Sequence, residues 1–330
     1  MDDESLYIVT AINGASVINS FYDESLIVVY NTAVEFYKIH NSLELVDRIP
    51  LNAKVSCAAY FESQLLILTM KCQLIISKNN DTKTLDLYEE SGRIAEFGHV
   101  MIVDPTLCFI ACHIYQGLVK IIPVEYALDS TDSKKGKRKF TLHKSPFNVR
   151  LKELLVLDMI FLSTLHDPCL VILHQDALEN THIVSYSIDF ENNELVKSDL
   201  IQEMTLDQGV NRLIPMTDDL KGCILAISQS GLTLISQSLQ KKVVQFHEKS
   251  ISAWEWMDSK TLLLIDHNGS LHKLLIGNLK DDKWEMKSLG SVSSLACINN
   301  FKHLSLPLRL SDYSLRSIVF SNLRFLRPHL

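Results

Sequence analysis

No apolar run in this sequence reaches the roughly 18 residues that suggest a membrane-spanning helix, so we expect no membrane span. The N-terminus carries Asp2, Asp3 and Glu4 in place of the positive charge and apolar stretch of a secretory signal, so no signal peptide is expected. Sustained 3.6-residue periodicity is missing as well, which argues against long amphipathic helices. These absences leave an all-β soluble fold as the main expectation.

Sequence motifs of catalysis are also missing. The chain has no G-x-S-x-G elbow, Walker loop, G-x-G-x-x-G or H-E-x-x-H pattern, and its twelve histidines are scattered. Cys108, Cys112 and His113 lie close together, but no second ligand pair has zinc spacing. The seven cysteines are an odd number and mostly lie in apolar runs, which favours buried, reduced thiols. We therefore expect no catalytic residues, no metal, no cofactor and no small-molecule substrate.

The sequence also lacks an excess of positive charge. The chain has 32 Lys and Arg against 39 Asp and Glu, a formal net charge of -7. Because phosphate binding needs a basic surface, nucleic acid is expected to be reached only indirectly, through a complex. One basic run stands out, and it is interpreted either as a nuclear localisation signal or as a solvated loop. It consists of Lys134, Lys135, Lys137, Arg138 and Lys139.

What the sequence does contain is a repeated hairpin: an apolar β-branched run, a short polar turn and a second apolar run. The copies recur at intervals of about 40 residues, the length of a four-stranded propeller blade. Seven copies are found, at residues 25–39, 64–77, 107–123, 169–188, 223–236, 261–276 and 303–320. They predict an all-β, seven-bladed β-propeller of four-stranded antiparallel blades, with the strand at 6–12 closing the last blade.

The expected domain organisation follows from this repeat. Residues 1–320 are predicted to form a single propeller, interrupted by a surface loop at 128–146 and followed by a C-terminal tail at 321–330. The loop is predicted because residues 130–139 are polar and charged and have no apolar side chain to anchor them to a core.

Several blocks of residues carry a resemblance to a known family. They are Gly92-Arg93, Val103-Asp104-Pro105, the stretch Tyr115–Val124 and the Asn-x-Arg-Leu-x-Glu-Leu block at 148–154. These blocks resemble the first β-propeller of the large subunit of damaged-DNA-binding protein. The wider family includes the largest subunit of the cleavage and polyadenylation specificity factor and a splicing factor 3b subunit.

The resemblance implies a scaffold in which three propellers link a cullin-type ubiquitin ligase to its substrate receptors. In that family the second propeller holds the cullin, and the first and third grip the receptors. Since this chain is similar to the first propeller only, we expect a truncated, non-enzymatic member. It would bind substrate receptors, be linked to DNA-damage repair and occur in nucleus and cytoplasm. An RNA-processing scaffold for polyadenylation or splicing is the alternative, and a propeller hydrolase is a third hypothesis.

The hairpin turns on one face of the disc are the expected partner contacts, chosen by position along the chain. The candidate residues are Tyr115, Gln116, Asp266, His267, Asn268, Arg309 and Asp312.

Overall fold

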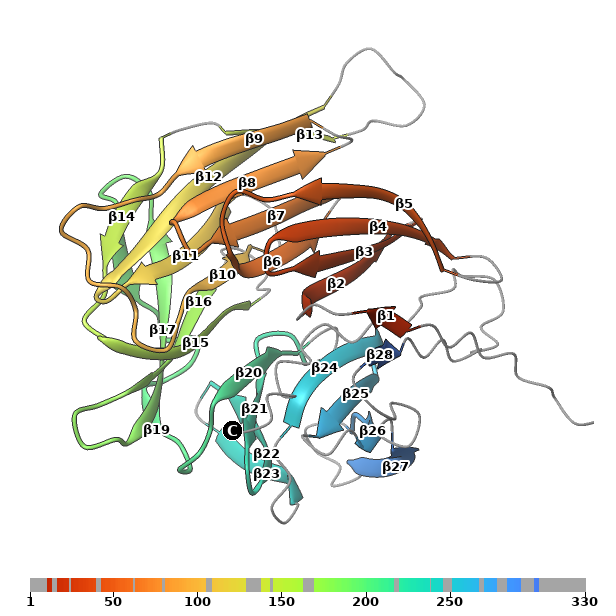
Figure 1. Ribbon diagram of the computed structural model, residues 1–330. Coiled ribbons are helices and arrows are strands. Elements are labelled where there is room, and N and C mark those ends of the chain that lie inside the picture. The colour runs from red at the N-terminus through yellow and green to blue at the C-terminus, as the bar shows by residue number, and fades with distance from the viewer. Residues whose placement is uncertain are drawn as a thin grey trace, which may run out of the picture. The chain divides into compact units, whose positions relative to one another are not determined.

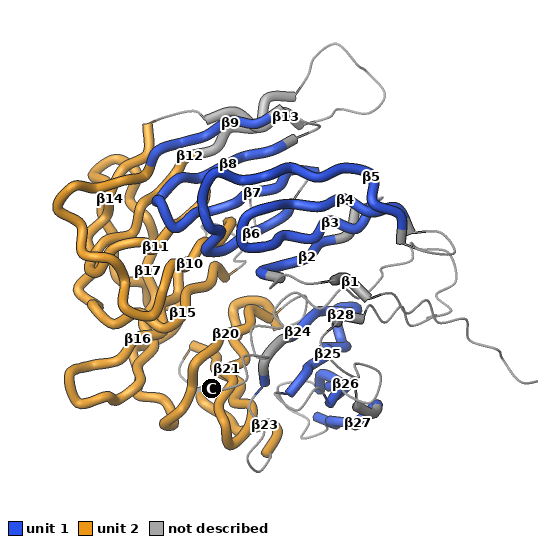
Figure 2. The backbone as a smooth tube through the Cα atoms, in the orientation of Figure 1, with its two compact units in different colours: residues 1–86, 249–277, 283–330 blue, residues 87–248, 278–282 orange. Residues whose placement is uncertain are grey.

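The regular elements of the computed structural model are antiparallel β-strands, as the apolar, β-branched runs of the sequence predict (Figure 1). The chain divides into two compact units, residues 1–86, 249–277 and 283–330, and residues 87–248 and 278–282 (Figure 2). The structure describes residues 11–13, 17–23, 25–39, 43–61, 63–78, 81–104, 109–128, 138–142, 145–162, 169–216, 220–237, 239–245, 251–266, 270–277, 284–291 and 300–302.

The first unit contains three four-stranded sheets, each in the order in which its strands follow along the chain. We number the sheets of the molecule as blades in chain order. The first blade consists of β2 (Val17–Asp23), β3 (Ser25–Tyr30), β4 (Ala33–Ile39) and β5 (Leu43–Pro50). The second consists of β6 (Val55–Phe61), β7 (Gln64–Thr69), β8 (Gln73–Lys78) and β9 (Asp81–Asp86). The sixth consists of β24 (Ile251–Asp258), β25 (Thr261–Asp266), β26 (Ser270–Leu275) and β27 (Glu285–Ser291).

The second unit contains the other three blades, two of which have a fifth strand. The third blade consists of β10 (Val100–Val103), β11 (Phe109–Tyr115), β12 (Leu118–Leu128), β13 (Arg138–Leu142) and β14 (Phe147–Arg150). The fourth consists of β15 (Leu155–Leu162), β16 (Cys169–Gln175), β17 (Thr181–Asp189), β18 (Glu194–Lys197) and β19 (Met204–Thr205). The fifth consists of β20 (Arg212–Pro215), β21 (Ile224–Ser228), β22 (Gly231–Ser236) and β23 (Leu239–Gln245).

The strand order fixes which loops lie together in each blade. In an antiparallel meander, the turn between the second and third strands lies at the same end of the sheet as the connections that enter and leave it. In the third blade this end holds the β11–β12 turn and the connections at 87–99 and 151–154. In the fourth blade it holds the β16–β17 turn. We call this the turn end of a blade.

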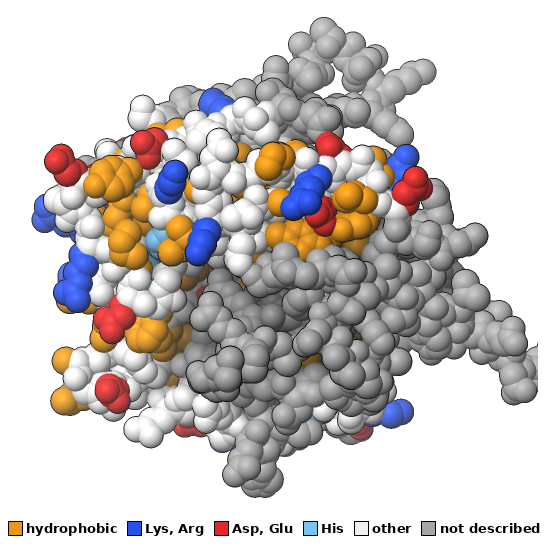
Figure 3. All heavy atoms as spheres, in the orientation of Figure 1, with side chains coloured by type: hydrophobic (Ala, Val, Ile, Leu, Met, Phe, Trp, Pro, Cys, Tyr) orange, Lys and Arg blue, Asp and Glu red, His pale blue; other side chains and the backbone are white. Residues whose placement is uncertain are grey.

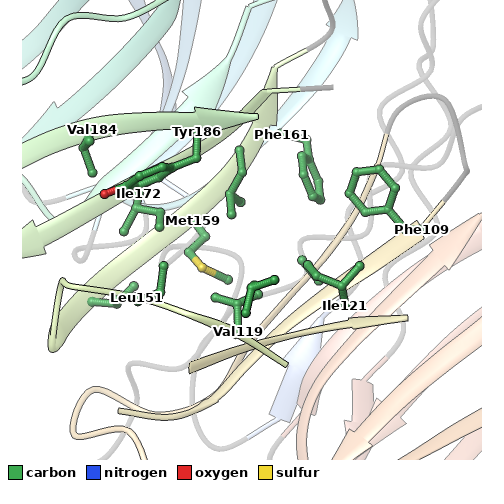
Figure 4. Packing of buried hydrophobic residues seen from close by; sticks show 13 residues of the cluster. Phe109, Val119, Ile121, Leu151, Met159, Phe161, Ile172, Val184 and Tyr186 are labelled. Carbon is green, nitrogen blue, oxygen red and sulfur yellow. The ribbon is translucent and has the colours of Figure 1, made fainter. Parts of the chain in front are cut away.

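The two middle strands of each blade supply most of the core. In β3, β7, β11, β21 and β25, nearly every side chain is buried, so both faces of these strands pack against other parts of the protein. One core cluster of the second unit lies between the third and fourth blades, where Phe109 of β11 meets Phe161 of β15 edge to face at 5.0 Å (Figure 4). Met159 and Leu151 belong to the same cluster. The third blade is thus anchored firmly to the fourth.

Neighbouring blades are also joined through their first strands, by the same device in both units. Asn19 follows a bulge in β2, accepts the N–H of the next residue on Oδ1 and donates from Nδ2 to the Ala58 carbonyl of β6 at 2.9 Å. Asp158 follows a bulge in β15, accepts the N–H of the next residue on Oδ1 and accepts the Leu213 N–H of the next blade on Oδ2 at 2.9 Å. At these two blade boundaries, a bulge therefore directs one short polar side chain toward the next blade.

The prediction of seven blades is wrong: the described residues form six. Six of the predicted hairpins are present as β3–β4, β7–β8, β11–β12, β16–β17, β21–β22 and β25–β26. The seventh, at 303–320, lies outside the described residues. The strands nearest the chain ends, β1 (Ala11–Asn13) and β28 (Asn300–Lys302), pair with each other in a two-stranded sheet. Counting apolar hairpins overestimated the blades because a blade also needs an inner and an outer strand.

The third blade, like the fourth, has two segments at its outer position. The first half of β12 pairs with β14, and its second half pairs with β13, so two segments share the edge of this long strand. β13 falls inside the segment 128–146 that was predicted to be a surface loop. Of the basic run, Arg138 and Lys139 begin β13, whereas Lys134, Lys135 and Lys137 lie outside the described residues.

Candidate partner-binding surface

The turn between β11 and β12 is held between two connections at the turn end of the third blade. The Gln116 N–H donates to the Arg93 carbonyl at 2.8 Å, and the Leu151 N–H donates to the Gly117 carbonyl at 2.8 Å. Ile94 also forms a bridge with Tyr115. Backbone hydrogen bonds on both sides therefore make this turn and its two neighbouring connections one ordered surface.

The buried side chain of Tyr115 supports this turn. Its side chain is only 3% exposed, and its hydroxyl accepts the Glu89 N–H at 2.9 Å. Its ring lies against Gly92, where a Cβ would come within 2.4 Å of the ring, so only glycine fits. Gln116 is half-buried at the turn itself. The prediction that Tyr115 and Gln116 contact a partner stays a prediction.

Gly117 completes the turn with a φ of 70°, a conformation that favours glycine. The side chain of Leu154 lies over it, 3.4 Å from where a Cβ would stand. Ile94 and Leu154 flank the turn and are 48% and 58% exposed. Arg93, Arg150 and Lys152 are exposed next to them. We call the five exposed residues Arg93, Ile94, Arg150, Lys152 and Leu154 the Gly117 patch.

A hydrogen-bonded carboxylate holds the 87–99 connection to the blade. The Glu89 carboxylate accepts from Lys120 of β12 and from the Asn148 side chain of β14, the latter at 2.9 Å. These two donors hold the pKa of Glu89 below its usual value. In Figure 3, exposed apolar side chains alternate with Lys and Arg side chains on the part of the surface where Figure 1 places these strands.

The fourth blade continues the surface with a second ordered turn. Asp176 accepts the N–H groups of Leu178 and Asn180 on Oδ1, at 2.8 and 2.9 Å, and the side chains of Asn180 and His182 on Oδ2, both at 3.0 Å. These donors, Asn180 first, hold the pKa of Asp176 below its usual range. The turn leaves Leu178 at its tip, 81% exposed. Because Leu155 pairs with Gln175, Leu154 lies at the same end of the sheet as this turn.

The sixth blade contains the same arrangement in a buried form. Asp266 accepts the Ser270 N–H at 2.8 Å and lies 3.1 Å from His272 Nε2, and both side chains are 2% exposed. Asp, turn N–H and His are spaced at i, i+4 and i+6 in both blades. We call this an Asp–His clasp. It could have been found in the sequence as the repeated D-x5-H spacing.

The other predicted contacts lie in the first unit or outside the described residues. Asp266 belongs to the first unit and Tyr115 and Gln116 to the second. His267, Asn268, Arg309 and Asp312 lie outside the described residues. The exposed residues Ile94, Leu154 and Leu178 were not among the predicted contacts, because single exposed aliphatic residues carry no motif.

One hydrogen-bond chain in the fourth blade resembles hydrolytic chemistry at first sight. Thr205 Oγ1 lies 3.3 Å from His182 Nδ1, and His182 Nε2 lies 3.0 Å from Asp176. His182 and Thr205 are direct strand neighbours, and Asp176 already holds the turn. The chain therefore follows from strand pairing and turn closure. Across the part of the protein that the structure covers, no group of three His, Cys, Asp or Glu side chains could hold a metal ion. In the same part, no helix is long and apolar enough to cross a membrane.

Meander blades joined strand to strand and a hydrogen-bonded turn surface define a β-propeller protein consistent with a non-catalytic scaffold. The profile of the family described as RSE1/DDB1/CPSF1 first beta-propeller matches residues 15–306. The chain belongs to this family. The all-β propeller class and the resemblance to the first propeller of damaged-DNA-binding protein are thereby confirmed.

Individual relatives agree with the family assignment. DNA damage-binding protein 1 of Solanum lycopersicum is 31% identical over 218 residues, which cover 65% of this chain and 18% of that protein. DNA damage-binding protein 1b of Arabidopsis thaliana is 27% identical over 293 residues, covering 83% and 26%. DNA damage-binding protein 1 of Schizosaccharomyces pombe is 27% identical over 234 residues, covering 67% and 20%. The chain thus spans about a fifth to a quarter of the length of these relatives.

Proposed function

We propose that this chain is a non-enzymatic protein-binding module of a ubiquitin-ligase adaptor, linked to DNA-damage repair, whose partners are substrate receptors of a cullin-type ligase. Nucleic acid would be reached only through the assembled complex. One observation carries the proposal: the blocks on which the family resemblance rests, Gly92-Arg93, Tyr115–Gly117 and 148–154, converge on the Gly117 patch. An ordered surface with exposed aliphatic and Arg side chains is typical of protein-binding sites.

The test is capture of receptor proteins by the whole chain. The double substitution Ile94→Asp with Leu154→Asp places two charges at the apolar centre of the patch and is expected to abolish capture. The matched control is Leu275→Asp with Leu289→Asp, which alters two exposed leucines of the sixth blade. Equal capture by both variants, with thermal midpoints unchanged, would place the binding surface elsewhere.

The RNA-processing alternative is not favoured, because the relatives described above are named as DNA damage-binding proteins. Cross-linking of the chain to polyadenylation or splicing components in cell extract would reverse this preference.

For localisation, we propose that the chain occurs in nucleus and cytoplasm and that the basic run at 134–139 is a nuclear localisation signal. Five of its six residues are Lys or Arg in a chain of net charge -7. Replacing those five residues by Ser or Gln in a fluorescent fusion should remove the nuclear fraction. An unchanged distribution would favour the solvated-loop interpretation.

A further inference from the structure

The Gly117 patch carries three positive charges that form no ion pair with another described residue. Arg93, Arg150 and Lys152 are exposed, and the ion pairs found between described residues leave all three out. Backbone hydrogen bonds bring them together around one turn, through the Arg93 carbonyl on one side and the Leu151 N–H on the other. Like charges held side by side repel each other, so a ligand of opposite charge would be attracted here.

Three carboxylates near the patch are already engaged. Glu89 accepts from Lys120 and Asn148, and Glu153, between Lys152 and Leu154 in the chain, accepts the Tyr186 hydroxyl at 2.7 Å. Asp176 accepts from two backbone N–H groups and two side chains. The remaining exposed acids of the 87–99 connection, Glu90 and Glu96, lie in turns on either side of Arg93 and Ile94. The charges around the Gly117 turn are therefore available to an acidic ligand.

The apolar part of the patch indicates what kind of acidic ligand fits. Ile94 and Leu154 flank the Gly117 turn, and Leu178 extends the apolar surface at the same end of the fourth blade. Exposed aliphatic side chains bind other aliphatic side chains. A chain of net charge -7 also repels a polyanion at longer range.

We infer that the Gly117 patch, with Leu178, binds an acidic peptide segment of a partner protein, in which apolar anchor residues alternate with Asp or Glu. The apolar anchors would cover Ile94, Leu154 and Leu178, and the carboxylates would pair with Arg93, Arg150 and Lys152. Arg can hold a carboxylate through two parallel hydrogen bonds, so the two arginines would set the register of the segment. This inference rests on the proposed function, because it names the chemistry by which the partner is recognised.

Selection of random peptides displayed on phage, with the whole chain as bait, tests the inference without assuming a sequence. Selected peptides are expected to be acidic and to carry spaced Leu, Ile or Phe residues. A synthetic peptide from the selection should bind roughly tenfold more weakly or worse to Arg93→Glu/Arg150→Glu/Lys152→Glu, because each reversed charge replaces an attraction by a repulsion. Lys83→Glu/Lys221→Glu/Lys287→Glu is the matched control, since it makes the same charge change at three exposed lysines outside the patch. Affinity for the control should be unchanged.

Two further measurements sharpen the test. Glu90→Gln/Glu96→Gln should strengthen binding of the same peptide, because it removes negative charge beside the patch, and rising salt should weaken binding to the wild type. Selection of basic or neutral peptides, equal binding by the triple variant and its control, or tighter patch-dependent binding of a labelled single-stranded oligonucleotide would overturn the inference. If receptor capture persists while no acidic peptide is selected, the proposed function stands and this inference fails. If the wild-type chain also captures no receptor protein, both fail.

Discussion

The Asp–His clasps of the fourth and sixth blades have the same spacing and almost the same geometry, yet one is exposed and the other buried. The Asp176–His182 and Asp266–His272 contacts measure 3.0 and 3.1 Å, and in both the Asp also accepts the N–H of the residue at i+4. The side chains of the first pair are 35% and 21% exposed, those of the second 2% each. Local sequence thus determines the hydrogen-bond pattern, and burial determines how much these hydrogen bonds contribute to stability.

The difference in surroundings separates two uses of one motif. In the sixth blade, loss of an acceptor would leave buried donors without water, so the clasp mainly stabilises the hairpin. In the fourth blade, water can replace the same bonds, so their main consequence is the shape of a turn that displays Leu178. We therefore expect the buried clasp mainly to stabilise the fold and the exposed clasp mainly to hold Leu178 at the surface, which we call its display role.

Asp266→Ala should have the largest effect on stability. It leaves the Ser270 N–H and the buried His272 ring without their acceptor, which is expected to lower the free energy of unfolding by about 3 kcal/mol. Urea-induced unfolding of the whole chain measures this, with Asp176→Ala as the matched control. Equal losses in the two variants would contradict the distinction between a buried and an exposed clasp.

For a third carboxylate, Asp158, burial reverses the direction in which its contribution to stability changes with pH. Burial raises the pKa of Asp158 to about 6, although the Arg212 charge and two backbone N–H donors act in the other direction. The folded carboxyl therefore holds its proton more tightly than the unfolded one, whose usual value is 3.8. The stabilisation from this group is fully present below about pH 4 and is lost as pH rises through 6. For Asp176 the pKa is lowered, so its stabilisation is present above the usual value and lost on acidification.

Unfolding measured from pH 4 to pH 7 tests this contrast. Relative to Asp158→Asn, the wild type should lose on the order of 2 kcal/mol over this range, since the variant cannot titrate there. The hydrogen bond to Leu213 that the amide disturbs adds an offset that does not vary with pH, so the slope is the diagnostic quantity. Asp176→Asn should show a difference of opposite sign, below pH 4. A flat difference for Asp158→Asn would show that this carboxyl is not desolvated.

The sequence predicts much of the fold but little of the candidate site. Six hairpins followed from apolar runs around polar turns, because strand pairing depends on local pattern. The direction of the turn side chains did not follow from this pattern. Tyr115 and Asp266 were selected by position at turns, yet each is the last residue of a strand and its side chain is buried. The Gly117 patch could not be predicted, because it joins residues 93, 117 and 151 through backbone bonds that depend on how the connections fold.

The smallest effect on stability is expected in the exposed clasp, and there the two uses of the motif can be separated. Asp176→Ala and Leu178→Ser should both leave the thermal midpoint of the chain nearly unchanged, because the groups they alter are accessible to water. Both should weaken binding of a peptide selected on the Gly117 patch, the first by loosening the turn and the second by removing its apolar tip. Leu275→Ser, at an exposed leucine of the sixth blade, serves as the control. If Leu178→Ser weakens binding and Asp176→Ala does not, Leu178 contacts the ligand without needing the clasp, and the display role of the exposed clasp is wrong.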